Sequence, residues 1–194
     1  LKAEWPREND KAHGLVRSYY PNGKLKAEIA YKDGMPEGEL KEYDKDGRLK
    51  FERHFAAGLP DGVFKEFYPS GVLKSEVLWS EGNPQGPAKG YYESGALRFE
   101  EPYAAGLLNG MRKEFYESGK IMSTWEYVRG LPEGPAKTYY PSGKLAVECL
   151  FEKGKPAGPC RAFTEQGEAA DGPIRGFYPG GKPALEFHAE DGVP

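Results

Sequence analysis

Residues 134–148 read Gly-Pro-Ala-Lys-Thr-Tyr-Tyr-Pro-Ser-Gly-Lys-Leu-Ala-Val-Glu, and this stretch recurs with small changes every 24 residues along the chain. Two further series of glycines, which begin at Gly14 and Gly34, have the same period. Self-similarity at a fixed period of this length indicates a repeat architecture, in which each repeat is one supersecondary unit. The second glycine of the quoted stretch, Gly143, belongs to a series of seven: Gly23, Gly47, Gly71, Gly95, Gly119, Gly143 and Gly167.

Each repeat contains two short runs rich in Tyr, Phe, Leu and Val in which positions alternate in character, a pattern typical of β-strands. A tight turn such as residues 141–143 joins the two runs, and a looser turn such as residues 34–38 joins the repeats. Proline fixes φ at the first position of the tight turn, and glycine accepts a left-handed one. We therefore expect an all-β fold, with tandem 24-residue β-hairpin repeats forming one elongated, twisted antiparallel meander sheet.

Two registers are compatible with the tight turn. A type I turn followed by a bulge places Tyr19 opposite Leu25, and it puts the leucine row and both aromatic rows, those of Tyr19 and Tyr31, on one face. A two-residue turn instead places Arg17 opposite Glu28 and gives a ladder of cross-strand ion pairs. Proline at the first turn position suits the type I turn, so we favour the first register.

The repeat pattern divides the chain into four parts. Residues 1–13 hold the second strand of an incomplete N-terminal repeat, residues 14–157 six complete repeats, residues 158–171 a shortened repeat, and residues 172–194 a terminal repeat that is a candidate cap. After Gly167 the pattern resumes ten residues early, as after the deletion of one second strand. Because the chain opens inside a repeat and not at Met, we expect that sequence upstream has been removed.

Composition and charge exclude several classes of protein. The 26 Gly and 17 Pro among 194 residues fall every few positions, which rules out a helical bundle. No apolar run approaches the roughly 18 residues of a membrane span, and no signal peptide is visible. The formal net charge is −3, with 27 basic and 30 acidic residues mixed along the chain, so we expect no nucleic-acid partner.

No catalytic motif is visible. The sequence lacks a Gly-x-Ser-x-Gly elbow, a phosphate-binding Gly-x-x-x-x-Gly-Lys-[Ser/Thr] loop and a His-Glu-x-x-His helix. His13, His54 and His188 fall at unrelated repeat positions, so we expect no metal site. A structural pairing explains the glutamate that recurs in the repeats, such as Glu28, more simply than acid–base chemistry does. We expect a protein that is not an enzyme and binds no cofactor.

The two cysteines, Cys149 and Cys160, lie on strands that we expect to be neighbours. A pairing centred on Gly154 and Lys155 places them opposite each other, where a cross-strand disulfide fits and would imply an oxidising compartment. The alternative is a pair of reduced, half-buried thiols, and we favour this alternative at the level of the sequence.

A row of tyrosines that begins at Tyr20, each directly after a residue of the fully aromatic row of Tyr19, gives the best indication of function. Adjacent residues of a strand point to opposite faces, so this row and the fully aromatic row of Tyr19 cannot both be covered by one layer. Asp44 and Thr164 interrupt the tyrosine row, which we therefore expect to be the exposed one, and tyrosine is favoured at protein interfaces. The alternative is that these side chains simply pack along the sheet. The candidate partner-binding residues are Tyr20, Tyr68, Tyr92, Tyr116, Tyr140 and Tyr178.

The core Gly-x-x-Lys-x-Tyr-Tyr-Pro-x-Gly-Lys-Leu-x-x-Glu of residues 134–148 resembles the MORN repeat, in the variant form found in the bacterial YwqK-like antitoxin family. The resemblance covers almost the whole chain. It implies an elongated repeat sheet that binds proteins, with membrane lipid bound by some relatives, and a role in neutralising a partner toxin. The Lys and Glu positions and the 24-residue period depart from the standard MORN pattern, so we do not expect lipid binding.

Two functions fit these observations. The first, which we favour, is a non-catalytic scaffold that binds a protein partner along an exposed aromatic face, with an antitoxin-like neutraliser as its specific form. The second is the binding of a cell-wall glycan or choline-type ligand, since aromatic hairpins can cage a cation, although only Trp5, Trp79 and Trp125 occur here. An open meander also leaves unpaired edges, which favour end-to-end self-association unless a cap covers them.

Overall fold

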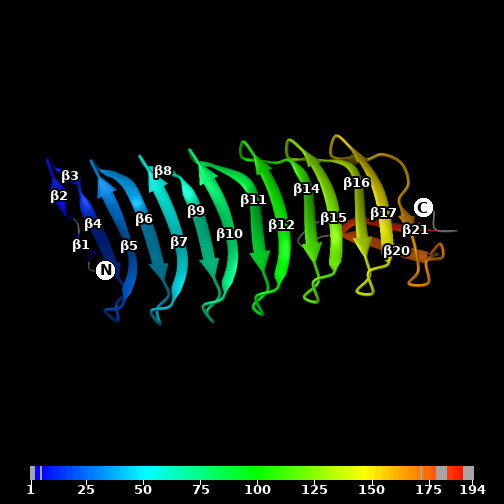
Figure 1. Ribbon diagram of the computed structural model, residues 1–194, viewed down its shortest axis with the longest axis horizontal. Coiled ribbons are helices and arrows are strands. Elements are labelled where there is room, and N and C mark those ends of the chain that lie inside the picture. The colour runs from blue at the N-terminus through cyan, green and yellow to red at the C-terminus, as the bar shows by residue number, and fades with distance from the viewer. Residues whose placement is uncertain (1–2, 5, 171, 178–182, 190–194) are drawn as a thin grey trace. The chain divides into compact units, whose positions relative to one another are not determined.

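The structure of the chain is a computed structural model that divides into two compact units, Leu1–Gly95 and Ala96–Pro194. In both units the regular elements of the described residues are β-strands (Figure 1). These residues include no helix of the length and apolarity that a membrane crossing requires. Side chains are described for residues 6–170. The backbone is described for residues 3–4, 6–170, 172–177 and 183–189.

The N-terminal unit is an antiparallel meander in which the strands from β4 onward pair with their neighbours in the chain (Figure 1). Strand β1 pairs with β4, while β2 and β3 form a separate ladder. The strands are β1 (Ala3–Glu4), β2 (Arg7–Glu8), β3 (Lys11–Ala12), β4 (Gly14–Tyr19), β5 (Leu25–Lys32), β6 (Met35–Tyr43), β7 (Leu49–Ala56), β8 (Leu59–Pro60), β9 (Gly62–Phe67), β10 (Leu73–Ser80) and β11 (Asn83–Tyr91).

The C-terminal unit repeats the same arrangement, from β12 through β14, β15 and β16 to β17. Strand β17 pairs with the short β18 and β19, and β20 and β21 form a hairpin of their own. The strands are β12 (Leu97–Ala104), β13 (Leu107–Leu108), β14 (Gly110–Phe115), β15 (Ile121–Val128), β16 (Leu131–Tyr139), β17 (Leu145–Glu152), β18 (Lys155–Pro156), β19 (Arg161–Ala162), β20 (Gly172–Phe177) and β21 (Pro183–Ala189). The predicted all-β class and the antiparallel meander of hairpins are confirmed.

The tight turn has the hydrogen bonds of a four-residue turn closed by a glycine bulge. The N–H of Gly143 donates to the carbonyl of Tyr140 at 2.7 Å, and the N–H of Tyr140 donates to the carbonyl of Lys144 at 2.9 Å. Gly143 has a φ of +93°, in the left-handed region that favours glycine. The turn with a bulge that we favoured from the sequence is therefore the one present.

A second bulge lies directly beside this turn and combines the two registers. Tyr19 faces Leu25, but the ladder then shifts by one residue, so that Arg17 faces Glu28. The same shift occurs in the hairpins β6–β7, β9–β10, β14–β15 and β16–β17. The extra residue of the bulge is what allows the tyrosine–leucine pair and the ion-pair ladder to coexist.

The two aromatic rows lie on opposite faces, so the prediction that they share one face is wrong. The hydroxyl of Tyr91, in the row that begins at Tyr19, donates to Glu76 at 2.8 Å. Tyr91 therefore lies on the face that carries the cross-strand pairs of basic residues with glutamates, which we call the lysine–glutamate face. The row that begins at Tyr31 includes Phe55 and Trp79 and lies on the other face. There the ring of Phe64 contacts the rings of Phe55 and Trp79 at centroid distances of 5.7 and 5.3 Å. The bulge reverses the alternation between the two rows, because it adds one residue to one strand only.

The turn between repeats is shorter than expected. Lys32 pairs directly with Met35, which leaves Asp33 and Gly34 as a two-residue turn with φ values of +52° and +87°. Two left-handed residues in succession are the requirement of a type I′ turn, which suits the twist of an antiparallel hairpin. The looser turn predicted over residues 34–38 is wrong in its extent, since residues 35–38 already belong to β6.

The described apolar core is concentrated in the C-terminal unit. Phe151 is only 1% exposed and packs against Trp125 with a centroid distance of 5.2 Å. In the N-terminal unit the fully buried apolar side chains among the described residues are Val16 and Ala88. The cluster of buried residues comprises Trp125, Tyr127, Ala136, Val147, Cys149, Phe151, Cys160 and Ala162.

Candidate binding surfaces

The candidate tyrosines link consecutive repeats through their hydroxyl groups. Four of these hydroxyls donate to the backbone carbonyl of the residue 23 positions later, which directly precedes the tight turn of the next hairpin. The rings are half-buried, as is that of Tyr92, while Tyr178 lies outside the described residues. The hydrogen-bonded pairs are Tyr20 with Tyr43 (2.8 Å), Tyr68 with Tyr91 (2.8 Å), Tyr116 with Tyr139 (2.7 Å) and Tyr140 with Phe163 (2.8 Å).

The two residues that interrupt the tyrosine row bond to their own turns instead. The carboxylate of Asp44 accepts hydrogen bonds from the N–H groups of Asp46 and Arg48 at 2.8 and 2.9 Å. These bonds, that from Arg48 foremost, hold the pKa of the Asp44 carboxyl below its usual value. The Thr164 hydroxyl accepts from the N–H of Glu168 at 3.3 Å. The row therefore consists of links between repeats, interrupted where a short polar side chain closes its own turn.

The lysine–glutamate face carries ion pairs at the predicted register. Arg17 contacts Glu28 at 3.3 Å, and Glu148 contacts both Lys137 at 3.0 Å and Arg161. The hydrogen bond from Lys137 lowers the pKa of Glu148, and the same contact raises the pKa of Lys137. A carboxyl group held in its ionised form is a poor proton donor near neutral pH, which favours the structural interpretation of this row.

A buried charge cluster occupies the apolar face of the C-terminal unit. Arg112, with a side chain 6% exposed, contacts Glu101 and Glu114 at 2.8 Å each. Ser123 donates to Glu114 at 2.9 Å, and Tyr103 donates to Glu101 at 3.2 Å. Burial, with the negative charge of Glu101 second, raises the pKa of Tyr103 to about 12.

Sequence reasoning missed this cluster, although the repeat contained a signal for it. The positions that correspond to Arg112 in other repeats hold apolar residues such as Leu40 and Phe64, and Val77 corresponds to Glu101. A basic residue in an apolar row, beside an acidic residue in a row that is otherwise apolar except at Arg53, indicates a charge pair on the apolar face.

Half-exposed apolar side chains stand beside the two-residue turns. In the N-terminal unit Met35 and Leu59 are 48% and 51% exposed, and in the C-terminal unit Leu107 and Leu131 are 49% and 52% exposed. All four occupy the same position of the 24-residue repeat, directly after the turn glycine. We call this set the turn leucine row. Single exposed leucines are common on protein surfaces. In the sequence, only the recurrence of these residues at one repeat position could have identified the row.

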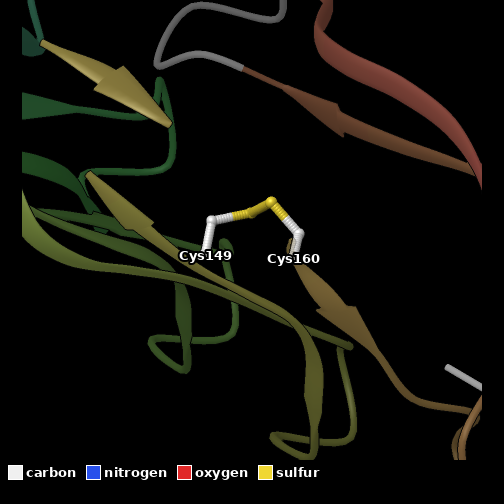
Figure 2. Close-up of a disulfide and its surroundings, with 2 residues drawn as sticks. All are labelled: Cys149 and Cys160. Carbon is white, nitrogen blue, oxygen red and sulfur yellow. A yellow bond between two sulfur atoms is a disulfide. The ribbon is translucent and has the colours of Figure 1, made fainter. Parts of the chain in front are cut away.

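Cys149 and Cys160 are joined by a disulfide (Figure 2). Their Cα atoms are 4.3 Å apart, and both residues are buried in the apolar cluster of the C-terminal unit. The bond ties the segment before β19 to β17, and the described ladder between these strands consists of only the pairs Val147–Ala162 and Glu148–Arg161. The disulfide therefore adds a covalent link to a short ladder.

The described histidines make local contacts. His54 Nδ1 lies 2.8 Å from the carbonyl oxygen of Asp61, and His13 Nδ1 lies 3.4 Å from a carboxylate oxygen of Glu8. The side chain of His188 lies outside the described residues. Within the described part of the chain, no group of three or more His, Cys, Asp or Glu side chains is placed to hold a metal ion.

The fold and these surfaces define a β-hairpin repeat protein. Comparison with protein families identifies the MORN repeat variant, and the chain belongs to this family, whose repeats are generally protein- or lipid-binding modules. The narrower resemblance to YwqK-like antitoxins is not supported by any matching relative. The matched segments are residues 12–33, 36–57, 60–81, 84–105, 108–129 and 132–153.

No curated protein matches the chain. Among solved structures, the chain is similar to one described as "Crystal structure of GtfA/B complex bound to UDP and GlcNAc", with 12% sequence identity and a TM-score of 0.26. The match covers 62% of this chain and 25% of that one, so the chain spans about a quarter of the length of its match. A similarity this low supports no argument about function.

Proposed function

We propose that the chain is a non-catalytic scaffold that binds a protein partner along the rim of its hairpins where the two-residue turns lie. The observation that supports this most directly is the turn leucine row, with Met35 and Leu59 in one unit and Leu107 and Leu131 in the other. Large apolar side chains left half in water at one repeat position are typical of contact surfaces and not of chance exposure. Tandem repeats commonly present such regular rows to a partner.

The tyrosine row is the second contact surface of this proposal. Its hydroxyls are engaged within the sheet, as in the bond from Tyr68 to the Tyr91 carbonyl, so its rings would contribute their faces and edges. Rings held in place by a hydrogen bond lose little conformational freedom on binding, which favours affinity. This row lies at the tight turns, at the opposite ends of the strands from the turn leucine row.

A non-catalytic role is supported by the partners of the titratable groups. Glu28 and Glu148 on the lysine–glutamate face each contact a basic side chain, and the half-buried Glu101 and Glu114 are held by the buried Arg112. These contacts explain the groups as structural elements of the sheet. Neutralisation of a toxin, as the resemblance to antitoxins suggests, is the specific form of binding that we propose to test first.

Affinity capture with the whole chain tests the proposal. The parent should retain one polypeptide from an extract of the encoding organism in near one-to-one ratio, and the variant M35S/L59S should lose it. The matched control L15S/L78S changes side chains on the lysine–glutamate face that are 39% and 45% exposed, and it should retain the partner. Equal retention by all three proteins, or retention by none, would overturn the proposal.

Two further measurements sharpen the result. A retained partner that is toxic when expressed alone and harmless when co-expressed with the chain would establish the antitoxin form. Flotation with vesicles that contain anionic lipid tests the other activity general to these repeats, and binding to vesicles without a protein partner would replace our proposal by a lipid-binding one.

A further inference from the structure

The tyrosine row of the N-terminal unit has a gap at Asp44. Tyr20 precedes this position by one repeat and Tyr68 follows it, and both extend a ring and hydroxyl to the next hairpin. The Asp44 side chain is too short for this and turns back onto the N–H groups of its own turn. A hollow of about 260 Å³ lies here between the hairpins β6–β7 and β9–β10. Its lining includes Asp44, Leu49, Lys50, Phe67, Tyr68 and Lys74.

The neighbouring repeats show which side chain this hollow lacks. Tyr20, Tyr68, Tyr116 and Tyr140 each reach the carbonyl of the residue 23 positions later, and for position 44 that residue is Phe67. The apolar side chains of Leu49 and Phe67 line the hollow. The ring of Tyr68, the next tyrosine of the row, lines it as well. The site therefore offers apolar walls and a carbonyl acceptor in the geometry that holds a phenol elsewhere in the row.

The rim of the hollow carries three basic and two acidic side chains. Arg48, Lys50 and Lys74 line it, against the carboxylates of Asp44 and Glu66. Lys74 is bound to Glu66 at 2.7 Å, and Arg48 lies 3.8 Å from Asp44. Among the described residues Lys50 has no carboxylate within ion-pair distance, and its ammonium lies 5.4 Å from the centroid of the Phe51 ring. An acidic group arriving beside the hollow would pair with Lys50.

We propose that the Asp44 hollow binds a tyrosine side chain of a partner protein, supplied by a segment with an acidic residue beside that tyrosine. The partner ring takes the place that Tyr20 and Tyr68 fill in their own repeats, its hydroxyl donates to the Phe67 carbonyl, and the acidic residue pairs with Lys50. The volume suits a single ring, since pockets for larger ligands measure about 300–1,000 Å³. The inference rests on the proposed function only in that a protein supplies the tyrosine.

Binding of small probes to the intact chain tests the hollow without any knowledge of the partner. We would titrate the isotope-labelled protein with p-cresol, and separately with the peptides acetyl-Glu-Tyr-Glu-amide and acetyl-Glu-Phe-Glu-amide, and follow backbone amide shifts by NMR. Shifts should cluster at residues 44–50 and 66–69, with the tyrosine peptide binding at least about threefold tighter than the phenylalanine peptide, as expected for one added hydrogen bond. Shifts spread over all repeats, or equal affinities for the two peptides, would overturn the inference.

Two variants separate the parts of the site. D44Y supplies the missing ring from within the chain, so it should abolish p-cresol binding and raise the midpoint of urea unfolding. K50E should weaken binding of the tyrosine peptide by a larger factor than binding of p-cresol, because only the peptide carries the acidic neighbour that pairs with the Lys50 charge. Undiminished p-cresol binding by a folded D44Y protein, or an unchanged peptide affinity in K50E, would contradict the proposal.

The outcomes also distinguish this inference from the proposed function. Failure of the probes to bind, while M35S/L59S still abolishes capture of a protein partner, would overturn the inference about the hollow and leave the proposed scaffold function supported. Binding of the probes at the hollow, with no protein retained from the extract, would remove the scaffold and leave a site for phenolic side chains.

Discussion

The hydroxyl of Tyr116 donates a hydrogen bond of 2.7 Å to the backbone carbonyl of Tyr139, so that a side chain of one repeat satisfies a backbone group of the next. Tyr140 makes the same contact to Phe163 one repeat later. In a repeat protein the interfaces between neighbouring units supply much of the stability, because each unit contacts only its neighbours. A row of such bonds therefore couples the folding of consecutive hairpins.

Removal of the Tyr116 hydroxyl should weaken this coupling. The variant Y116F keeps the ring and loses one hydrogen bond, so we expect the free energy of unfolding to fall by about 1 kcal/mol, measured by urea denaturation. Tyr19, in the other aromatic row, is the matched control, since equivalent positions already hold phenylalanine, as at Phe67. Y19F should change stability by no more than a few tenths of a kcal/mol, and equal losses in both variants would refute the role assigned to the hydroxyl.

Much of the fold could be predicted from the sequence because glycine and proline mark its turns at fixed intervals. The tight turn was predicted from residues 141–143, and Gly143 is left-handed there. The predicted turn between repeats, residues 34–38, began one residue too late and extended too far, because the prediction treated Gly34 and Gly38 alike. Asp33-Gly34 is a strong signal for a two-residue hairpin turn, whereas Gly38 lies within β6, where the ladder to β5 shifts register.

Alanine at Gly62 should be more costly than alanine at Gly71, although both glycines are left-handed, with φ of +98° and +87°. A β-carbon at residue 62 would lie 3.1 Å from Cβ of His54, whereas one at residue 71 would meet nothing within 4 Å. We expect G71A to lose about 1 kcal/mol from its backbone conformation alone and G62A to lose at least about 1 kcal/mol more through the contact. Urea unfolding of both variants gives the difference, and equal losses would show that His54 moves aside freely.

The buried cluster around Arg112 should be destabilised most when only its cation is removed. R112L leaves the half-buried carboxylates of Glu101 and Glu114 without a counter-charge, which should cost about 3 kcal/mol. The double variant R112L/E101V places at these positions apolar side chains that the same rows hold at Leu40 and Val77, and it leaves only Glu114 without a counter-charge, so we expect it to recover part of the loss. Urea denaturation of the parent, R112L, E101V and the double variant closes a double-mutant cycle. A double variant no more stable than R112L would show that the cluster is needed for the fold itself.

The functional surfaces were less predictable than the fold, and the reason is physical. Repetition fixes which residues share a row, but burial depends on neighbours from other strands. The tyrosine row was expected to be exposed because Asp44 and Thr164 interrupt it, yet the hydroxyls of Tyr20 and Tyr68 reach backbone groups that no sequence pattern identifies. The faces of the aromatic rows were misjudged for a similar reason, since a single bulged residue reverses the alternation.

The ion pair between Glu148 and Lys137 should make part of the stability depend on pH. Its contact with Lys137 lowers the pKa of Glu148 in the folded state, so the ionised carboxylate stabilises the fold above the unfolded-state pKa near 4.5. This contribution is lost as the pH falls through the lower folded-state value. E148Q should therefore be less stable than the parent at pH 7, by no more than about 1 kcal/mol for a pair that solvent still reaches, and the difference should narrow as the pH falls to 3. The control E117Q, at an exposed tight turn, should show no such convergence in urea unfolding at the two pH values.

The disulfide between Cys149 and Cys160 should stabilise the end of the meander, where the described ladder between β17 and β19 holds only two residue pairs. A bond between residues 11 positions apart restricts the unfolded chain, and its loss should lower the free energy of unfolding by about 2–3 kcal/mol. The variant C149V/C160A places side chains that the same rows hold at Val77 and Ala136, so it removes the bond without leaving a buried thiol. Its stability should match that of the reduced parent and should not change with dithiothreitol. If the reductant leaves the urea midpoint of the parent unchanged while mass spectrometry shows both thiols free, pairing and packing alone hold β19 in place.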